Sequence, residues 1–268
     1  MSAKTAVITG STRGIGAGMA KAFLERGWNV VINGRSAASV EQAAASLSTV
    51  NPDAVVLGVP GDVSDYAQVE NLWAQAAGRF GKVDLWINNA GLSHAPTPFW
   101  EMPPEQMETI VRANITGTMY GTRVAIRGML AQGGGALYNM EGLGSSGRQR
   151  VSGLSIYAST KAALRFFDQA IAQELAGTPV LFGTLSPGMV LTDMLLNRQV
   201  QEGPDWERTK RVFNILADRT ETVAPWLVEQ MIANREHGRR IRWLTGSKIA
   251  WRFLSSPFVK RDLFTDLP

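Results

Sequence analysis

The chain passes from a short apolar run into a helical pattern through the turn Thr9-Gly10-Ser11-Thr12-Arg13-Gly14-Ile15-Gly16. Glycines in such a turn let the chain bend tightly, let backbone N–H groups approach a pyrophosphate, and let the helix pack close to a sheet. A plain tight turn is the alternative, but the position between a strand and an amphipathic helix favours a dinucleotide site. The residues predicted to bind the cofactor here are Gly10, Ser11, Thr12, Arg13, Gly14, Ile15 and Gly16.

The rest of the chain alternates strand-like and helix-like patterns. The apolar runs are short and do not alternate with polar residues, as expected of parallel strands buried on both faces. We therefore expect an α/β fold, a single doubly wound Rossmann-type parallel sheet with helices on both faces, in one domain over residues 1–268. The predicted strands are 5–9, 30–33, 54–59, 83–88, 136–139, 180–185 and 241–244, and the predicted helices are 14–26, 40–47, 66–79, 104–132, 157–176 and 222–235.

The amino-acid composition limits which catalytic groups and metal sites the protein can have. The 268 residues are 45% apolar and 19% charged, with no cysteine and two histidines. Disulfides, iron–sulfur clusters, zinc ribbons, thiol nucleophiles and most histidine-ligated metal sites are excluded, so proton transfer must fall to Tyr, Lys, Asp or Glu. The first residues lack a signal-peptide pattern, and no apolar run approaches the ~18 residues typical of a membrane span, so we expect a cytoplasmic protein.

The net charge of +4 is concentrated near the carboxyl end. Residues 235–268 contain eight Lys and Arg against three Asp and Glu, which gives +5. In the C-terminal extension, residues 239–268, Trp and Phe are interleaved with Arg and Lys; such a segment can dock weakly on an anionic membrane surface, or pack on the domain or a sister subunit. Nucleic-acid binding needs a wider basic surface and is not expected.

The segment 192–220 interrupts the strand–helix alternation and is predicted to form a substrate lid.

Asn33-Gly34-Arg35-Ser36 follows the second predicted strand, where NAD-preferring Rossmann domains usually place an acid for the ribose 2′-hydroxyl. Arg35 stands there instead, and Arg13 lies in the glycine turn. Guanidinium groups bind phosphate through several charge-assisted hydrogen bonds, so the two arginines suit a 2′-phosphate. Arg35 and Ser36 are therefore predicted to bind NADP(H); exposed surface arginines are the alternative.

Tyr157 and Lys161 are four residues apart in a helical pattern, so their side chains share one face. A free tyrosine has a pKa of about 10, and lowering that pKa by about 3 units requires about 4 kcal/mol of stabilisation. The Lys161 ammonium and an oxidised nicotinamide ring can supply it. The two side chains can therefore act together, with a purely structural pair as the alternative.

Three motifs follow the glycine turn along the chain: Asn88-Asn89-Ala90-Gly91, Tyr157-Ala158-Ser159-Thr160-Lys161 and Ser186-Pro187-Gly188-Met189-Val190-Leu191-Thr192. With the glycine turn, they make the chain from residue 4 to about 235 closely resemble the short-chain dehydrogenase/reductase family. The resemblance implies that Tyr157 exchanges a proton with the substrate oxygen while hydride moves to or from the nicotinamide, and that Lys161 holds the nicotinamide ribose. The other cofactor contacts that it implies are Asp62, Val63, Asn89, Ala90, Gly91, Pro187, Gly188, Val190 and Thr192.

The resemblance also implies a role for Asn114, which would bend its helix and position a water in a proton relay to Lys161; a helix N-cap is the alternative. The catalytic serine departs from the family pattern. Members commonly carry Asn-x-Ser-Ser after the fifth strand, with the second serine thirteen residues before the tyrosine, but this chain reads Asn139-Met140-Glu141-Gly142-Leu143-Gly144-Ser145-Ser146. We expect Ser145, or else Ser146, to bind the substrate oxygen; loss of the serine is the alternative, and Glu141 can cap a turn.

That unusual run, together with residues 186–196, 213–217 and 221–224, resembles the chlorophyll b reductase branch of the family. This branch reduces a ring formyl group to hydroxymethyl with NADPH, which implies reduction of an aldehyde or ketone on a bulky apolar substrate. The alternatives are a general ketone or alcohol oxidoreductase acting on steroid-like or acyl substrates, and a nucleotide-sensing protein without catalysis.

His94 can line the entrance of the substrate site or be an ordinary surface residue. The family further implies a homodimer or homotetramer, built through the helices at 104–132 and 157–176.

Overall fold

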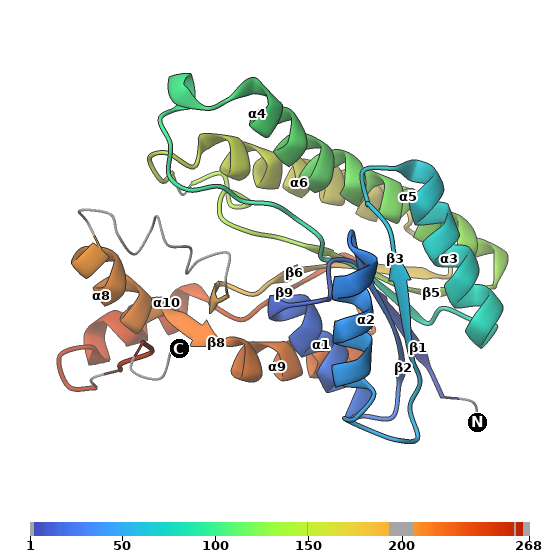
Figure 1. The fold of residues 1–268 in the computed structure, drawn as a ribbon. Helices are drawn as coiled ribbons and strands as arrows, with labels where there is room; N and C mark the ends of the chain where they lie inside the picture. The colour runs from blue at the N-terminus through green and yellow to red at the C-terminus, as the bar shows by residue number, and fades with distance from the viewer. Residues whose placement is uncertain (1–2, 149, 193–205, 260, 265–268) are drawn as a thin grey trace.

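The computed structural model describes residues 3–148, 150–192, 206–259 and 261–264. Its core is a parallel sheet with the strand order β3-β2-β1-β4-β5-β6-β9, which confirms the predicted α/β fold class (Figure 1). The order reverses between β1 and β4, where the carboxyl ends of neighbouring strands diverge and leave a crevice for a ligand. The strands are β1 (Thr5–Ile8), β2 (Asn29–Gly34), β3 (Val56–Pro60), β4 (Leu85–Asn88), β5 (Gly135–Met140), β6 (Val180–Ser186) and β9 (Arg239–Arg242).

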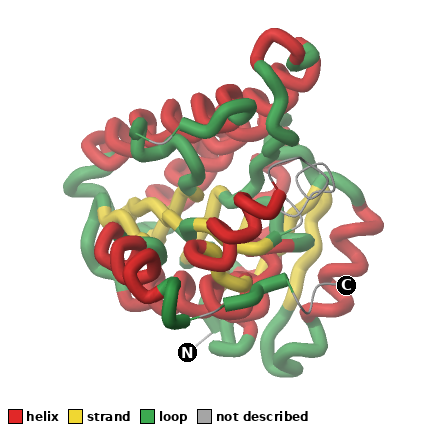
Figure 2. Tube along the Cα trace, turned by 90° about the vertical axis from the view of Figure 1, so that its left-hand side faces the viewer, coloured by secondary structure: helices red, strands yellow, loops and turns green. Residues whose placement is uncertain are grey.

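Helices cover both faces of the sheet, so that the strands run through the middle of the molecule (Figure 2). One face packs against α1, α2 and α9, and the opposite face packs against α3, α5 and α6, with α4 beside α6 (Figure 1). This sandwich buries the strands on both sides, which is why their apolar runs do not alternate. The helices are α1 (Gly14–Leu24), α2 (Ala37–Leu47), α3 (Tyr66–Phe80), α4 (Pro104–Val111), α5 (Gly117–Ala131), α6 (Ser155–Glu174) and α9 (Thr220–Ala233).

Strand β1 illustrates this double burial. Ala6 and Ile8 belong to the apolar cluster on the α1 and α9 side, whereas Val7 belongs to the cluster on the α3 and α5 side. All three side chains are fully buried. Successive strand residues point to opposite faces, so both faces need apolar residues.

The predicted helix 104–132 is divided in the structure. Between α4 and α5 lies a π-helical turn, Arg112–Thr116, which contains Asn114. π turns often occur at functional sites because the extra residue redirects a side chain. Here Asn114 is buried and contacts the loop after β4 instead of continuing the helix surface.

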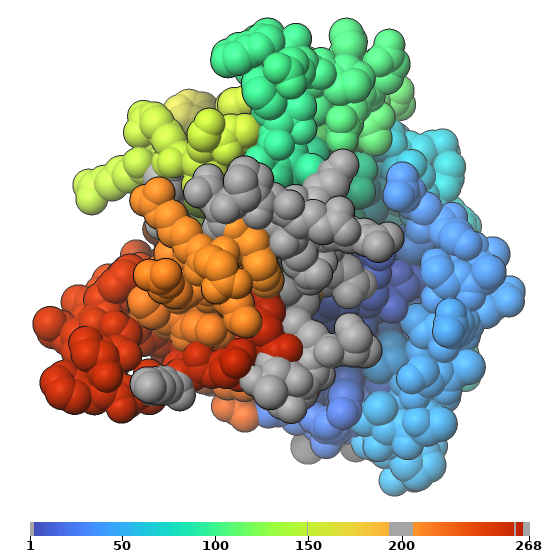
Figure 3. Space-filling model, turned by 60° about the vertical axis from the view of Figure 1, so that its left-hand side comes forward, coloured from blue at the N-terminus to red at the C-terminus, as the bar shows by residue number. Residues whose placement is uncertain are grey.

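The segment 192–220 contains structure that the sequence patterns did not reveal. Residues 193–205 lie outside the described part, but α8 (Trp206–Leu216) and β8 (Ala217–Arg219) follow, and β8 pairs in parallel with β7 (Met189–Leu191). Helix α10 (Gly246–Ser255) then lies beside α8, and Figure 3 shows α8 in orange and the red C-terminal segment together on one flank. Among the described residues, no helix has the length and apolar character needed to span a bilayer.

Asp218 fastens the C-terminal extension to this flank. Its carboxylate accepts hydrogen bonds from Trp243 Nε1 at 2.6 Å, from Arg252 at 2.8 Å and from Arg261 at 2.9 Å. Two of the basic side chains in the extension are therefore directed inward. Trp251, Leu254 and Phe258 remain exposed, however, so the extension packs on the domain only in part.

Candidate active site

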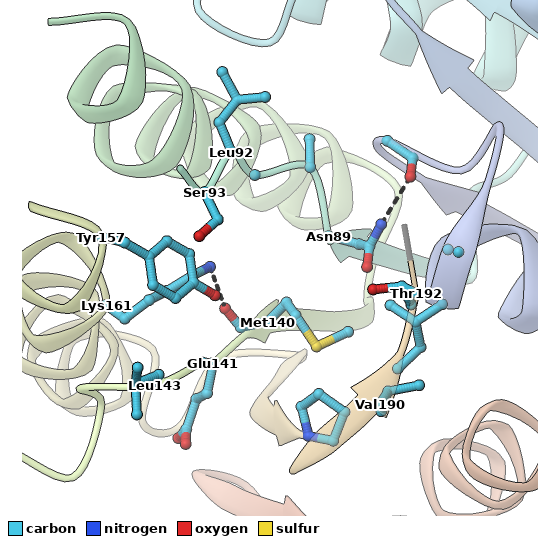
Figure 4. Close-up of a pocket in the computed structure, with 18 of the residues that line it drawn as sticks. Asn89, Leu92, Ser93, Met140, Glu141, Leu143, Tyr157, Lys161, Val190 and Thr192 are labelled. Atoms are coloured by element: carbon cyan, nitrogen blue, oxygen red, sulfur yellow. Dashed lines mark hydrogen bonds between the residues drawn. The ribbon is translucent and has the colours of Figure 1, made fainter. Parts of the chain in front are cut away.

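The carboxyl ends of β1, β4, β5 and β6 open into one cavity of ≈ 1730 Å³. Ligand pockets commonly measure roughly 300–1,000 Å³, so this cavity has room for a dinucleotide and a second molecule. One half contains the glycine turn and the end of β2, and the other half reaches α8 and the C-terminal extension. Tyr157 and Lys161 lie where the two halves meet (Figure 4).

The glycine turn can only be built from glycines at two of its positions. Gly10 has φ +60°, and a Cβ built on it would lie 2.7 Å from the Cα of Ala90. A Cβ on Gly16 would lie 2.6 Å from the carbonyl oxygen of Gly10. Both contacts are closer than real Cβ atoms tolerate, so the absence of side chains lets the backbone form a cradle that fits a pyrophosphate at the start of α1.

Ser11 is an exception among the residues predicted to bind the cofactor, because it does not line the cavity. It is fully buried, its hydroxyl donates to the Ile8 carbonyl at 2.6 Å, and its oxygen accepts from the Asn33 N–H at 3.1 Å. Ser11 thus joins β1 to β2 beneath the turn. The other predicted cofactor residues all line the cavity: Gly10, Thr12, Arg13, Gly14, Ile15, Gly16, Arg35, Ser36, Asp62, Val63, Asn89, Ala90, Gly91, Tyr157, Lys161, Pro187, Gly188, Val190 and Thr192.

The adenosine end of the cavity is basic. Arg13 and Arg35 are both exposed residues that line it. The Asp62 carboxylate also lines this end, but it accepts hydrogen bonds from the N–H and hydroxyl of Ser64, both at 2.8 Å. The end of β2 therefore presents a guanidinium, and not a carboxylate, toward the ligand space.

Tyr157 and Lys161 lie near the start of α6, one helical turn apart. Lys161 Nζ donates to the Met140 carbonyl at the end of β5, at 3.1 Å, and lies 6.0 Å from the centre of the Tyr157 ring (Figure 4). This hydrogen bond fixes the ammonium between α6 and the sheet. Since both side chains line the cavity, a ligand there can contact the two together.

Burial controls the proton affinities of both groups. Removal of water from the Tyr157 hydroxyl raises its pKa to about 12. Burial lowers the pKa of Lys161 to about 8, against the opposing charges of Asp168 and Glu141. Asp168 is itself buried on α6, and burial raises its pKa to about 7 although Asn139 donates to it at 2.7 Å. Tyr157 is consequently protonated at neutral pH.

Asn114 lies behind the cavity wall and connects its parts. Its Oδ1 accepts from the Leu92 N–H at 2.7 Å, and its Nδ2 donates to the Leu92 carbonyl at 2.9 Å and to the Thr160 hydroxyl at 3.0 Å. The Thr160 hydroxyl donates to the Tyr157 carbonyl at 2.7 Å. Asn114 therefore ties the loop after β4 to α6, which differs from a simple N-cap.

Ser145 does not face the cavity, contrary to the prediction that it binds the substrate oxygen. It is buried, and its oxygen accepts from the Gly142 N–H at 3.0 Å within a tight turn. The position next to the Tyr157 hydroxyl belongs to Gly142, where an added Cβ would lie 2.5 Å from that oxygen. Ser146, the second candidate, does line the cavity.

Glu141 has a role that its sequence position did not reveal. Its side chain is almost fully buried and forms an ion pair with Arg240, whose Nε donates at 2.8 Å, while the Thr184 hydroxyl donates at 2.9 Å. Arg165 lies 3.5 Å from the same carboxylate. Glu141 thus joins β5, β6, β9 and α6 at the base of the cavity and is not a turn cap.

The far half of the cavity carries many apolar side chains, and Glu141, Arg148, Arg240 and Arg242 line it as well. Its walls come from the loop after β4, the segment after β5, helix α8 and the C-terminal extension. Trp206 packs edge-on against Phe213 and Phe264, with ring centres 6.4 and 5.2 Å away, which supports the α8 wall from outside. The apolar lining residues include Leu92, Leu143, Val151, Leu154, Phe213, Leu216, Leu244 and Ile249.

Comparison with known proteins agrees with this geometry. Residues 4–203 match the family described as short chain dehydrogenase. The chain is 35% identical over 279 residues to the chloroplastic, probable chlorophyll(ide) b reductase NYC1 of Arabidopsis thaliana. That match covers 98% of this chain and 55% of the relative, so the chain spans about half the length of that protein.

Solved structures share the same architecture. A 3-ketoacyl-(acyl-carrier-protein) reductase from Brucella melitensis, complexed with NADH, has a TM-score of 0.78 and 27% identity over 92% of this chain and 99% of its own. L-sorbose reductase from Gluconobacter frateurii, complexed with NADPH and L-sorbose, has a TM-score of 0.78 and 26% identity over 90% of this chain and 95% of its own. The similar structures therefore include complexes with either nicotinamide cofactor.

Proposed function

Since this chain belongs to the short-chain dehydrogenase/reductase family, we propose that it is an NADPH-dependent carbonyl reductase. Its substrate is a bulky apolar aldehyde or ketone, and the reaction is of the formyl-to-hydroxymethyl type. One observation carries the proposal: a single cavity joins the glycine cradle, the Tyr157–Lys161 pair and a large apolar half.

The adenosine end supports NADPH over NADH. Arg35 and Arg13 line the cavity where an adenosine ribose would follow from the glycine cradle, and the nearby Asp62 carboxylate is engaged by Ser64. A 2′-phosphate is bound well by guanidinium groups, whereas a 2′-hydroxyl would need an acceptor. In this proposal Arg35 contacts the 2′-phosphate.

When bound, the reduced nicotinamide supplies the hydride. Tyr157 supplies the proton: with a pKa raised to about 12 it is neutral at physiological pH and can donate to the carbonyl oxygen as negative charge develops there. Lys161, fixed by the Met140 carbonyl, places a positive charge beside the tyrosinate that results and can hold the cofactor ribose. Asn114 holds the loop after β4 and α6, which form two walls of the site, in fixed relative positions.

The apolar half supports a bulky substrate. Leucine, valine, isoleucine and phenylalanine side chains provide its surface, and burial of apolar area there stabilises a complex by about 25 cal/mol per Å². The relative named as a chlorophyll(ide) b reductase suggests a formyl-bearing tetrapyrrole as the first substrate to test.

We further propose a homo-oligomer that forms through α4, α5 and α6. Val111, Met119 and Phe166 on these helices are exposed apolar residues, with Phe166 77% exposed. Light scattering on the purified chain and on Phe166→Glu tests the interface; a wild-type dimer or tetramer that becomes smaller in the variant is the expected result.

The central experiment is a turnover screen. NADPH and NADH consumption is followed with a formyl-bearing tetrapyrrole, a steroid ketone and 2-naphthaldehyde. We expect turnover with NADPH and the tetrapyrrole. The KM for NADPH should be higher in Arg35→Ala than in the wild type. Arg79→Ala is the matched control, because Arg79 lies outside the cavity. Turnover of the steroid alone would assign the alternative substrate class, and a preference for NADH, or unchanged NADPH affinity in Arg35→Ala, would contradict the cofactor assignment.

A further inference from the structure

The residue next to the Tyr157 hydroxyl, Gly142, supplies no hydroxyl group to the substrate. The Ser145 hydroxyl oxygen is held in a turn by the Gly142 N–H at 3.0 Å, and the Ser146 hydroxyl oxygen, which lines the cavity, accepts from the Arg148 N–H at 3.2 Å. A carbonyl oxygen that accepts the proton of Tyr157 needs a second donor to fix its position. Another wall of the cavity also offers such donors.

The loop after β4 presents two polar side chains on the cavity wall, Ser93 and His94. Figure 4 shows the Ser93 hydroxyl directed toward Tyr157 and Lys161. No hydrogen bond of the Ser93 side chain is found within the described ranges of the chain. Its hydroxyl is therefore available to a ligand.

His94 has an unsatisfied buried nitrogen. The residue is only 7% exposed, and its Nδ1 lies 2.8 Å from the Ala95 carbonyl, which can only accept, so Nδ1 carries the hydrogen. In the neutral ring Nε2 is then an acceptor. Among the described residues, His94 Nε2 is the one buried side-chain polar atom without a partner. Leaving such an atom unpaired typically costs about 1–3 kcal/mol. Nε2 is itself enclosed, so it can accept from a bound molecule only after the ring turns toward the cavity that His94 lines, and the partner gained there would offset that cost.

The loop that carries these two residues is held at both ends. Asn114 bonds both the N–H and the carbonyl of Leu92, at 2.7 and 2.9 Å, and the Thr97 N–H donates to the Gly153 carbonyl at 3.0 Å. The backbone that carries Ser93 and His94 therefore keeps its position before a ligand binds. The Ser93 hydroxyl, which is directed into the cavity, can then bind with little reorganisation.

We propose that Ser93 and His94 form the polar recognition site for the substrate, in place of a hydroxyl group at position 142. The Ser93 hydroxyl donates to the carbonyl oxygen that Tyr157 protonates, and His94 Nε2 accepts from a hydroxyl or N–H group of the substrate. The preferred substrate is accordingly an apolar carbonyl compound with a hydrogen-bond donor beside the carbonyl. This inference rests on the proposed carbonyl reduction.

Two matched ketones test the pair: benzoin, which has a hydroxyl beside its carbonyl, and deoxybenzoin, which lacks it. We expect a higher kcat/KM for benzoin in the wild type. Ser93→Ala should lower kcat for both ketones by about 10²-fold, the usual effect of losing one such donor, while Ser93→Thr restores much of it. His94→Asn keeps the donor to the Ala95 carbonyl but removes Nε2, so kcat/KM should fall more for benzoin than for deoxybenzoin and the preference for benzoin should be lost. Exposed Ser48→Ala is the control.

Binding of benzoin, measured by calorimetry on the same variants and on Tyr157→Phe, separates this inference from the proposed reaction. If benzoin binds and the affinity falls in Ser93→Ala and His94→Asn, the recognition site stands even when no ketone is reduced, and only the proposed function fails. If the wild type reduces ketones but the Ser93 and His94 variants match it in kcat/KM and affinity, the site is overturned while the function stands. Absence of any benzoin binding overturns the site as well.

Discussion

Gly142 lies so close to Tyr157 that a Cβ at position 142 would be 2.5 Å from the tyrosine hydroxyl oxygen. The same Cβ would lie 3.2 Å from Cγ of Lys161. Any side chain at this position must displace the Tyr157 hydroxyl. The glycine is thus a requirement of the present site geometry and not only of the loop.

The variant Gly142→Ala should therefore lose activity more than stability. We expect kcat to fall at least about 10-fold because the Tyr157 hydroxyl is moved from its position, with a Tm close to that of the wild type. Steady-state kinetics and thermal unfolding measure the two effects. Gly78→Ala is the matched control: it lies in α3 with nothing within 4 Å of the added Cβ, and should raise stability by up to about 1 kcal/mol. Wild-type kcat in Gly142→Ala would contradict the close contact.

The charge of Glu141 should influence the alkaline limit of activity. Burial lowers the pKa of Lys161 to about 8, and the negative charges of Asp168 and Glu141 oppose this effect. Glu141→Gln removes one of them, so the pKa of Lys161 falls further and the ammonium is lost at a lower pH. The pH profile of kcat/KM should therefore decline earlier on its alkaline side. Glu229→Gln, which removes the exposed partner of Arg26, is the control; an alkaline limb that stays in place or moves upward in Glu141→Gln would count against the account.

Asp168 should make stability depend on pH. Burial raises its pKa in the folded state from the usual 3.8 to about 7. A group with a raised folded-state pKa contributes stability that is fully present below its unfolded pKa and is lost as pH rises through the folded value. Wild-type stability should thus fall between pH about 4 and 7 relative to Asp168→Asn, whose amide keeps an acceptor for Asn139. Each pKa unit corresponds to about 1.4 kcal/mol, so the difference is on the order of a few kcal/mol. Denaturant unfolding at pH 5 and pH 8 measures it, and parallel pH dependence in the two proteins would refute the prediction.

The Asp218 carboxylate should control the C-terminal extension. Asp218→Ala removes the acceptor shared by Trp243, Arg252 and Arg261, so two arginines lose their ion pairs. We expect faster proteolysis of the extension and a raised KM for the carbonyl substrate, because Leu244 and Ile249 line its half of the cavity. The Kd for NADPH should be unchanged. Exposed Asp53→Ala serves as the control, and an extension that resists protease as the wild type does would show that other contacts hold it.

The local parts of the fold and site were predictable from the sequence. Buried parallel strands give unalternating apolar runs, and the glycine turn must follow one of them, so the sheet and its ligand-binding edge could be deduced from patterns of neighbouring residues. The spacing of Tyr157 and Lys161 places them on one helix face whatever surrounds them. The prediction that Ser11 binds the cofactor was wrong, because a serine hydroxyl can equally well bind a phosphate or join β1 to β2.

The remaining features depend on contacts between distant residues. Glu141 pairs with Arg240, 99 residues away, and no local pattern reveals that partner. The loop after β5 turns at Gly142, which directs Ser145 into a backbone contact, and a small change in loop path would have reversed the outcome. The unpaired nitrogen of His94 likewise becomes visible only when all of its neighbours are in place.

The most direct test of the account compares NADPH oxidation by the wild type and by Tyr157→Phe, with a formyl-bearing tetrapyrrole and with 2-naphthaldehyde, at saturating cofactor. We predict turnover by the wild type, a loss of about 10²–10⁴-fold in kcat for the variant, and a Kd for NADPH that stays close to that of the wild type. Wild-type turnover by Tyr157→Phe, or a wild type that consumes no NADPH with either carbonyl compound, would contradict it.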